Sequence, residues 1–195
     1  MACLLIAFVR APVPVAPPAP VAIAFPGPKP QSTARILFPQ EKFPTLSLPG
    51  GQTRLVRSLL KVRKPLRFGG YVWKSDDVPQ GDVWVRVDLS RQTLSVFRAG
   101  HEIGTTVILY GTGGKPTPVG TFPIIERAKQ HRSTIYDADM PFMLRLTNDG
   151  IAIHASNVRT GFATHGCIGI PLAFARLLYD QVSRGDLVAI VGSVA

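Results

Sequence analysis

Short hydrophobic stretches separated by turn-forming residues fill the second half of the chain, from about residue 82 onward. They are rich in β-branched and aromatic residues, and polar or glycine-rich segments separate them. The stretches are residues 83–89, 93–100, 102–111, 120–128, 140–146, 150–154 and 187–191. Asn148-Asp149-Gly150 is typical of a hairpin turn. This pattern predicts a meander of strands.

One segment, residues 171–186, has the period of a helix instead. Pro171 stands at its start and Gly185 follows its end, as helix boundaries favour. Its apolar stripe consists of Phe174, Leu177, Leu178 and Val182. We therefore expect a mainly β domain with one packed helix near its C-terminal side, over residues 82–192.

The first residues follow a different pattern, in which an apolar run at 2–9 leads into a tract of Pro, Ala and Val. The run is shorter than the ~20 apolar residues that span a bilayer. It resembles the hydrophobic region of a signal peptide, and Ala22-Ile23-Ala24 offers a cleavage site. We interpret residues 1–24 as a signal peptide or an N-terminal membrane anchor, with a disordered tail as the alternative. The first two interpretations predict an exported protein of the periplasm or cell envelope.

Residues 25–81 read as a Pro-rich linker followed by a basic lead-in. Between residues 54 and 74 the chain carries basic side chains and no acidic one. The stretch 53–62 (TRLVRSLLKV) predicts a short amphipathic helix. Since the Pro-rich tract offers little to bury, we expect residues before about 81 to be dispensable for folding.

The net charge of +10 suits a protein that works beside an acidic partner. Nucleic acid, an anionic membrane face and an anionic cell-wall polymer all fit this charge. No RNA-binding signature or zinc-finger spacing occurs, so nucleic acid is disfavoured.

The chain has two cysteines, Cys3 and Cys167, and removal of a signal peptide would leave Cys167 alone. No internal disulfide could then form. A single thiol in an oxidising compartment is a liability unless its reactivity is used. The stretch THGCIG, in which Cys167 stands between glycines and close to His165, therefore predicts a nucleophile. We expect a low pKa for its thiol, because His154, His165 and the nearby backbone amides favour the thiolate.

Acyl transfer by a thiol needs a base, a group that orients the base, and N–H donors for the oxyanion. In GIAIHASN, alternation places His154 on the strand face opposite its isoleucine neighbours. The backbone amides of Gly166 and Cys167 precede the expected helix and could hold negative charge. A zinc site of His154, His165 and Cys167 is a weaker alternative, because it has three ligands and no CxxC pair. Taken singly, each residue also fits an ordinary core or surface position.

The segment GIAIHASN…ATHGCIGI resembles the active-site signature of the L,D-transpeptidase catalytic domain (YkuD-type) family. Residues 85–109, KPTPVGTFPI and the C-terminal helix and strand resemble the family's other segments in the same order. The resemblance implies a YkuD-like β-sandwich and a cysteine acyltransferase that acts on peptidoglycan stem peptides in cell-wall biogenesis and cell shape. It implies no metal or organic cofactor.

By this resemblance, Cys167 takes the nucleophile position and His154 that of the general base, oriented by the carbonyl of Ala155. His165 matches the second histidine, which helps to shape the oxyanion region around Gly166. The hydroxyl of Thr164 fills the position that fixes the loop.

Two further transfers concern substrate contacts. Gly169 stands where many family members have Asn or Arg, so a hydrogen-bonding side chain is missing there. The segment 131–142, with Tyr136, Met140 and Phe142, resembles the family's flap over the acyl donor. The alternatives to a transpeptidase are an L,D-carboxypeptidase or wall-editing hydrolase with the same site, and a catalytically dead wall-binding module.

Overall fold

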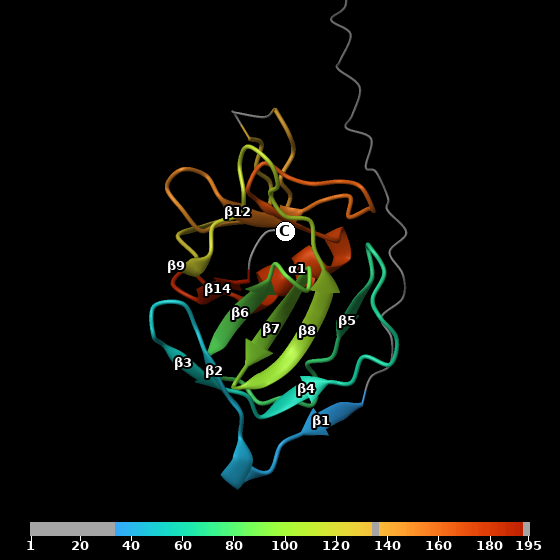
Figure 1. Ribbon diagram of the computed structural model, residues 1–195, viewed down its shortest axis with the longest axis vertical. Coiled ribbons are helices and arrows are strands. Elements are labelled where there is room, and N and C mark those ends of the chain that lie inside the picture. Colours follow the sequence, from blue (N-terminus) through green and yellow to red (C-terminus); the bar gives the residue numbers. More distant parts are fainter. Residues whose placement is uncertain (1–33, 134–136, 193–195) are drawn as a thin grey trace, which may run out of the picture.

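The computed structural model of the protein describes residues 34–133 and 137–192, so the predicted signal peptide or anchor lies outside the described residues. Three β-sheets, of eight, four and two strands, and one α-helix make up the described fold (Figure 1). A mainly β fold with a single described helix on the C-terminal side confirms the predicted fold class.

The larger sheet has eight strands in the order β1-β4-β8-β7-β6-β14-β9, with β5 paired to β8 as well. The strands are β1 (Arg35–Leu37), β4 (Ser58–Leu60), β5 (Tyr71–Trp73), β6 (Val83–Asp88), β7 (Thr93–Arg98), β8 (His101–Val107), β9 (Gly120–Pro123) and β14 (Leu187–Val191). The last strand pairs in parallel with β6 and antiparallel with β9. It therefore fills the gap between two earlier strands.

The smaller sheet carries the residues of the predicted site. Its order is β10-β11-β12-β13, and only β12 and β13 run in parallel. Its strands are β10 (Glu126–Ala128), β11 (Met143–Arg145), β12 (Ala152–Ala155) and β13 (Ile168–Ile170). A separate hairpin joins β2 (Thr45–Ser47) and β3 (Thr53–Leu55), after the short 3-10 helix η1 (Gln40–Lys42).

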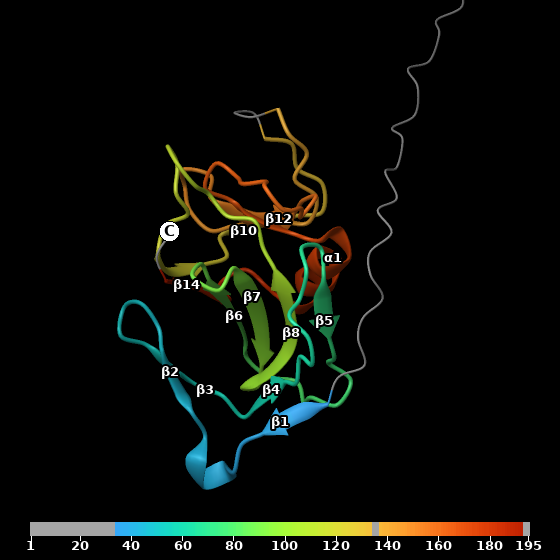
Figure 2. The same ribbon diagram turned by 45° about the vertical axis from the view of Figure 1, so that its right-hand side comes forward.

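The main core lies where the two sheets and helix α1 (Leu172–Gln181) meet. It takes Val85 and Leu94 from the larger sheet, Ile153 and Ile168 from the smaller one, and Phe174 from α1. Figure 2 shows the smaller sheet above the green strands of the larger sheet, with α1 beside them. The helix begins after Pro171, as the sequence predicts.

The amphipathic helix expected over residues 53–62 is wrong, because this stretch forms β3 and β4. Burial there alternates, with Val56, Ser58 and Leu60 buried and Arg57 exposed. A period of two is the period of a strand. The predicted stretch 120–128 also divides into β9 and β10, which belong to different sheets, and β13 was not predicted.

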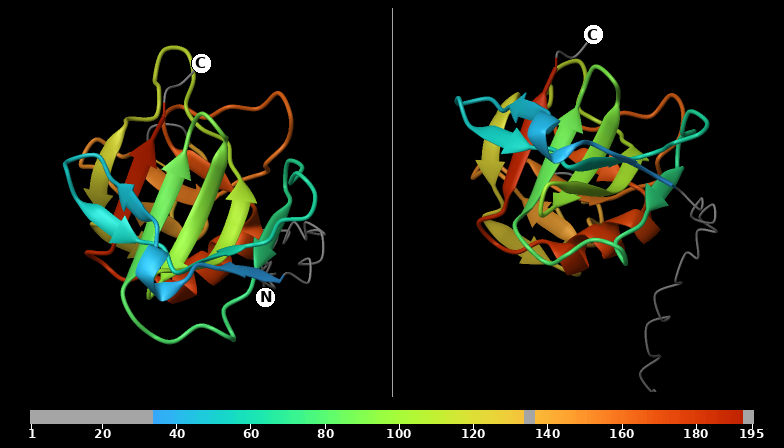
Figure 3. Two further views of the ribbon diagram at one scale, coloured as in Figure 1. Left: turned by 60° about the horizontal axis from the view of Figure 1, so that its bottom comes forward. Right: turned by 90° about the horizontal axis from the view of Figure 1, so that it is seen from below.

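Residues 34–81, which include the basic stretch and are called the lead-in from here on, pack closely against the larger sheet. Figure 3 shows this segment, coloured blue to cyan, lying along one end of the green strands. Its buried apolar side chains are Leu48, Val56, Leu60, Tyr71, Val72 and Val78. The expectation that residues before about 81 are dispensable for folding does not agree with this packing.

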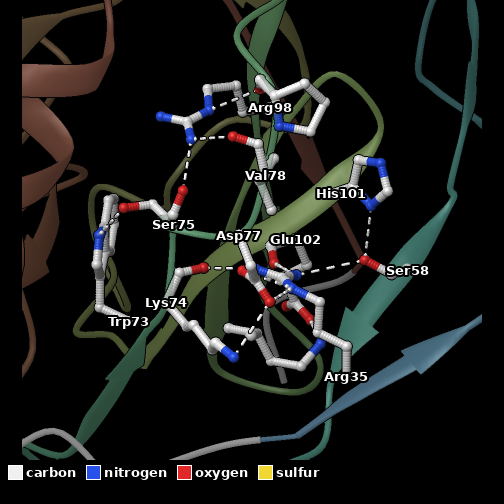
Figure 4. A network of polar contacts seen from close by, with 12 residues as sticks. Arg35, Ser58, Trp73, Lys74, Ser75, Asp77, Val78, Arg98, His101 and Glu102 are labelled. Atoms are coloured by element: carbon white, nitrogen blue, oxygen red, sulfur yellow. Dashed lines mark hydrogen bonds and ion pairs between the residues drawn. The ribbon is translucent and has the colours of Figure 1, made fainter.

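Arg35 fastens the lead-in to β8 through polar contacts (Figure 4). Its guanidinium donates to the carbonyl of Glu102 and to that of Lys74, both at 2.5 Å, and pairs with the carboxylate of Asp77 at 3.0 Å. This contact is the largest cause that lowers the pKa of Asp77 to about 2. The side chain of Glu102, in turn, accepts the backbone N–H of Leu60 at 2.8 Å.

Within residues 34–133 and 137–192, no helix has the length and apolar character needed to cross a membrane.

Candidate functional site

His154 lies on the outer face of the smaller sheet. Its neighbours Ile153 and Ala155 point into the main core, while His154 is only half-buried. The alternation expected from the sequence is therefore confirmed.

The parallel pairing of β12 and β13 brings Cys167 close to His154. His154 lies opposite Gly169, and Ile153 lies opposite Ile168. Cys167 immediately precedes β13, two residues before Gly169 and hence on the same face. The loop between the strands thus returns the thiol to a position diagonal to the imidazole.

One hydrogen bond fixes the tautomer of His154. The Nδ1 atom lies 2.9 Å from the carbonyl oxygen of Ala155, which only accepts, so Nδ1 carries the proton and donates it. The hydroxyl of Ser156 lies 3.4 Å from the same nitrogen. Burial lowers the pKa of His154 below its ordinary value, and the nearby His131 adds to this effect. A neutral imidazole with an unprotonated Nε2 results, which is the form a general base requires.

Cys167 is half-buried beside a small apolar cluster that contains Met140, Met143 and Ala152. Burial raises the pKa of the Cys167 thiol, although a hydrogen bond with the backbone of Ala152 and the charge of Lys115 oppose the rise. We expected a low pKa from the histidines and amides around the thiol. That expectation is wrong, because desolvation outweighs those contributions.

The backbone around Cys167 is held by two threonine hydroxyls. Thr164 donates to the carbonyl of Cys167 at 2.5 Å, in the loop-fixing position expected for it. Thr117, which is buried, donates to the carbonyl of Gly166 at 2.9 Å and accepts the N–H of Gly111 at 2.8 Å. The segment 109–117 is thereby tied to the cysteine loop from the side.

Two glycines in this loop are required by close packing. Gly166 has a φ of +103°, and a Cβ there would lie 2.6 Å from the Cδ1 atom of Ile151. A Cβ at Gly169 would lie 2.9 Å from the side chain of Ser156 and 3.3 Å from Leu109. Position 169 in this chain therefore has no room for an Asn or Arg side chain, which accounts for the departure noted in the sequence.

The helix is too distant to assist the amides of Gly166 and Cys167, contrary to our expectation. Strand β13 separates Cys167 from α1. Three extended residues span about 10 Å, and the influence of a helix terminus falls off within its first turn.

The other predicted residues are more scattered. His165 is exposed in the bend just before Gly166. Tyr136 lies outside the described residues. Phe142 packs toward the main core and contacts the ring of Tyr179 on α1, with ring centroids 5.7 Å apart. Phe142 thus lies on the side of the sheet opposite the thiol.

Residues 129–133 and 137–142 extend the β10–β11 ladder. The N–H of Met140 donates to the carbonyl of His131 and that of Phe142 to Lys129, at 2.8 and 3.0 Å. Arg132 forms ion pairs with Asp137 and Asp139, each at 2.8 Å. Of the side chains in these residues, Met140 packs with Cys167.

Sequence reasoning missed Thr117, Lys115 and Met143. The segment KPTPVGTFPI was recognised as a motif, and a small hydroxyl residue between two prolines was the available signal for Thr117. Nothing in the sequence indicates that Lys115 and Met143 approach Cys167, because this proximity arises from the tertiary fold. Within the described ranges, no group of three His, Cys, Asp or Glu side chains could hold a metal ion.

Comparisons with known proteins agree with this architecture. The family model of the L,D-transpeptidase catalytic domain, YkuD, matches residues 82–190. L,D-transpeptidase 1 of Mycobacterium tuberculosis is 27% identical over 130 residues, covering 57% of this chain and 52% of the relative. The chain spans about half the length of the curated relatives it matches.

Solved structures show the same fold. The crystal structure of an L,D-transpeptidase from Stackebrandtia nassauensis aligns with a TM-score of 0.54 at 26% identity, covering 62% of this chain and 61% of that one. That of L,D-transpeptidase 1 from M. tuberculosis aligns with a TM-score of 0.51 at 26% identity, covering 57% and 62%.

Proposed function

This chain belongs to the YkuD family of L,D-transpeptidase catalytic domains, and we propose on that basis that it is a cysteine acyltransferase that cross-links peptidoglycan stem peptides. The observation that carries the proposal is the β12–β13 register, which sets Cys167 diagonal to His154 on one face. The proposed enzyme uses no metal or organic cofactor and no nucleic acid. Its substrate places it outside the cytoplasm, in the periplasm or cell envelope.

The first half-reaction begins with a neutral thiol and a neutral imidazole. The Nε2 atom of His154 takes the thiol proton while the sulfur of Cys167 attacks the carbonyl carbon of the L-to-D peptide bond. The C–N bond breaks, the terminal D-residue leaves as an amine with the proton from His154, and a thioester remains. The carbonyl of Ala155 stabilises the imidazolium that forms between these transfers, since it accepts the Nδ1 proton.

The oxyanion of each tetrahedral intermediate is assigned to the backbone N–H groups of Gly166 and Cys167. Thr117 and Thr164 hold the adjoining carbonyls, so these amides are positioned before substrate arrives. We assign His165 to shaping this loop.

In the second half-reaction, an amine of another stem peptide attacks the thioester carbonyl. A C–N bond forms, the C–S bond breaks, and the amine proton passes through His154 to the departing sulfur. If water replaces the amine, the product is a shortened stem peptide and the enzyme is an L,D-carboxypeptidase.

Intact-protein mass spectrometry tests the proposal. The wild-type chain, given a stem tetrapeptide, should gain the mass of the acyl group with loss of the terminal residue, and a second stem peptide should then give a cross-linked dimer. Cys167→Ala should give neither product. A shortened stem without dimer at any acceptor concentration would assign the hydrolase instead. No adduct with the tetrapeptide or with a carbapenem would assign a dead wall-binding module.

A further inference from the structure

Lys115 belongs to a loop that is tied to the cysteine loop at both of its ends. Gly111 forms a β-bridge with Thr164, and its carbonyl accepts the N–H of Thr117 at 3.4 Å. The buried hydroxyl of Thr117 donates to the carbonyl of Gly166 at 2.9 Å. The backbone of Lys115, which lies between these two ties, is therefore held against the cysteine loop.

The missing side chain of Gly166 lets the aliphatic chain of Lys115 pass beside the nucleophile. A Cβ at Gly166 would lie 3.5 Å from Cγ of Lys115 and 3.7 Å from its carbonyl oxygen. Lys115 is half-buried, and lysines of this kind bury their methylenes while the ammonium stays in water. Burial raises the pKa of Cys167, and the charge of Lys115 opposes this rise. The ammonium is therefore close enough to act on a group bound at the sulfur.

Asp149 is an acidic residue that acts on the same thiol. It lies in the turn before β12, and the carbonyl oxygen of the next residue, Gly150, is 3.7 Å from the Sγ atom of Cys167. Beside the larger effect of burial, the charge of Asp149 raises the pKa of Cys167. A ligand with a negatively charged end would thus be attracted by Lys115 and repelled by Asp149. The two charges favour one orientation of such a ligand at the sulfur.

The acyl donor of the proposed reaction carries a negative charge close to its reacting bond. The terminal D-residue, which leaves in the first half-reaction, has the free carboxylate of the stem tetrapeptide. Only the N and Cα atoms of this residue separate the carboxylate from the scissile carbonyl, so the two carbons lie about 3–4 Å apart. When the sulfur of Cys167 attacks that carbonyl, the carboxylate lies within reach of a cation beside the sulfur. An ammonium donates charge-assisted hydrogen bonds to a carboxylate.

We propose that Lys115 binds the free carboxylate of the terminal D-residue and thereby selects stem peptides that end directly after the scissile bond. The assignment rests on the proposed function, because it names the group that recognises the acyl donor of the first half-reaction. Lys115 forms no covalent bond and transfers no proton. By holding the carboxylate, it orients the neighbouring carbonyl toward the sulfur of Cys167.

Acylation by two donors tests the assignment. One donor is a stem tetrapeptide with a free terminal carboxylate, and the other is the same peptide with a terminal carboxamide. Release of the terminal residue and the mass of the acyl-enzyme give a second-order rate constant for each donor. The wild type should react about 10- to 100-fold faster with the free carboxylate, as expected for a charge-assisted hydrogen bond.

Substitutions at position 115 should change this preference in a defined way. Lys115→Met should slow the carboxylate donor to about the rate of the carboxamide donor, whereas Lys115→Arg keeps the charge and should keep most of the preference. Both donors meet the same thiol, so the ratio of their rates cancels any effect of the substitution on Cys167 itself. Lys64→Met is the matched control, because Lys64 is exposed in the lead-in between β4 and β5. It should retain the full preference.

The outcomes separate this assignment from the proposed function. A wild type that reacts equally fast with both donors overturns the assignment of Lys115 alone. A Lys115→Met variant that slows both donors by the same factor also overturns it, because the lysine then acts on the thiol or the loop. A wild type that releases no terminal residue and forms no acyl-enzyme with either donor overturns the proposed function and the assignment together.

Discussion

At the scale of residues, burial sets the resting protonation of the proposed pair. Desolvation disfavours the charged form of both groups, so it raises the pKa of Cys167 and lowers that of His154. The resting site then holds a thiol and a neutral imidazole rather than an ion pair. Proton transfer must accompany attack on the substrate.

This protonation predicts the pH dependence of thiol alkylation. Iodoacetamide should modify Cys167 more slowly than free cysteine at pH 7, because the raised pKa leaves less thiolate. The rate should keep rising with pH beyond the ordinary thiol pKa. Mass spectrometry of timed samples from pH 6 to 10 measures it, and fast alkylation with a plateau below pH 8 would contradict the prediction.

The acylation rate should depend on pH in a different way from alkylation, because its decrease at low pH reports the protonation of His154. The base works only when neutral, so the lowered pKa of His154 keeps the rate high as pH falls past the ordinary histidine value of 6.5. The rate then drops as pH passes through the lowered pKa. Stopped-flow measurement of acylation by a carbapenem gives the pH profile. A midpoint of the acid limb at or above pH 6.5 would show that the burial of His154 in the free enzyme does not set the pKa of the base during acylation.

The two histidines should differ in their contributions. His154→Ala should reduce the acylation rate on the order of 10²–10⁴-fold, as for the loss of a general base. His165→Ala should reduce it less, since this exposed residue acts on the loop in our assignment. Single-turnover acylation of the two variants compares them directly. If His165→Ala is the inactive one, the roles are exchanged.

At the scale of elements, the cysteine loop owes its shape to the segment 109–117. Leu109 and Gly169 exchange backbone hydrogen bonds at 2.8 and 2.9 Å, and Thr117 bridges Gly111 to the carbonyl of Gly166. This bridge is buried, so its loss leaves buried polar groups without a hydrogen-bond partner. The segment 109–117, which does not carry the nucleophile, is therefore as necessary for the shape of the site as the loop that carries Cys167.

Thr117→Val should test this bridge. The substitution keeps the volume but leaves the N–H of Gly111 and the carbonyl of Gly166 without the hydroxyl, which costs about 1–3 kcal/mol of the free energy of unfolding. Acylation should slow as well, because the amides assigned to the oxyanion lose their support. Urea denaturation and acylation kinetics measure the two effects. Thr117→Ser keeps the hydroxyl and should behave like the wild type. A Thr117→Val variant with unchanged stability and unchanged acylation would refute the role of this bridge.

At the scale of the whole molecule, the lead-in and the family segment form one packed body. Six apolar side chains before residue 82 are buried: Leu48, Val56, Leu60, Tyr71, Val72 and Val78. Each contributes about 1.5–3 kcal/mol on burial. Their sum is comparable with the roughly 5–15 kcal/mol that stabilises a whole domain.

A chain that begins at Val83 should therefore fail to unfold cooperatively. It loses those side chains, exposes one side of β8, and lacks the Arg35 contacts to Lys74 and Glu102. Calorimetry and circular dichroism of residues 83–192 beside the full chain measure the difference. A sharp transition within a few degrees of the full chain would show that the lead-in is an appendage after all.

Local pattern predicted the parts of the fold that repeat with a strict period. The strands β6 to β8 and helix α1 follow from alternation or a 3.6-residue stripe. The strands of the lead-in could not be predicted in this way, because their positive charges mask the alternation of Val56, Ser58 and Leu60. At the site, motif residues could be named from the sequence, but the raised pKa of Cys167 and the placement of Phe142 depend on what the folded chain buries.

The position of β14 also governs when this molecule can become native. Strand β14 (Leu187–Val191) is inserted between β6 and β9, and Val188, Ala189 and Ile190 within it are fully buried. A ribosome delivers β6 and β9 first, so both present open edges until residues 187–191 have emerged. Open strand edges invite pairing with other chains. Until β14 joins the sheet, β6 and β9 therefore keep edges on which the strands of other chains can pair.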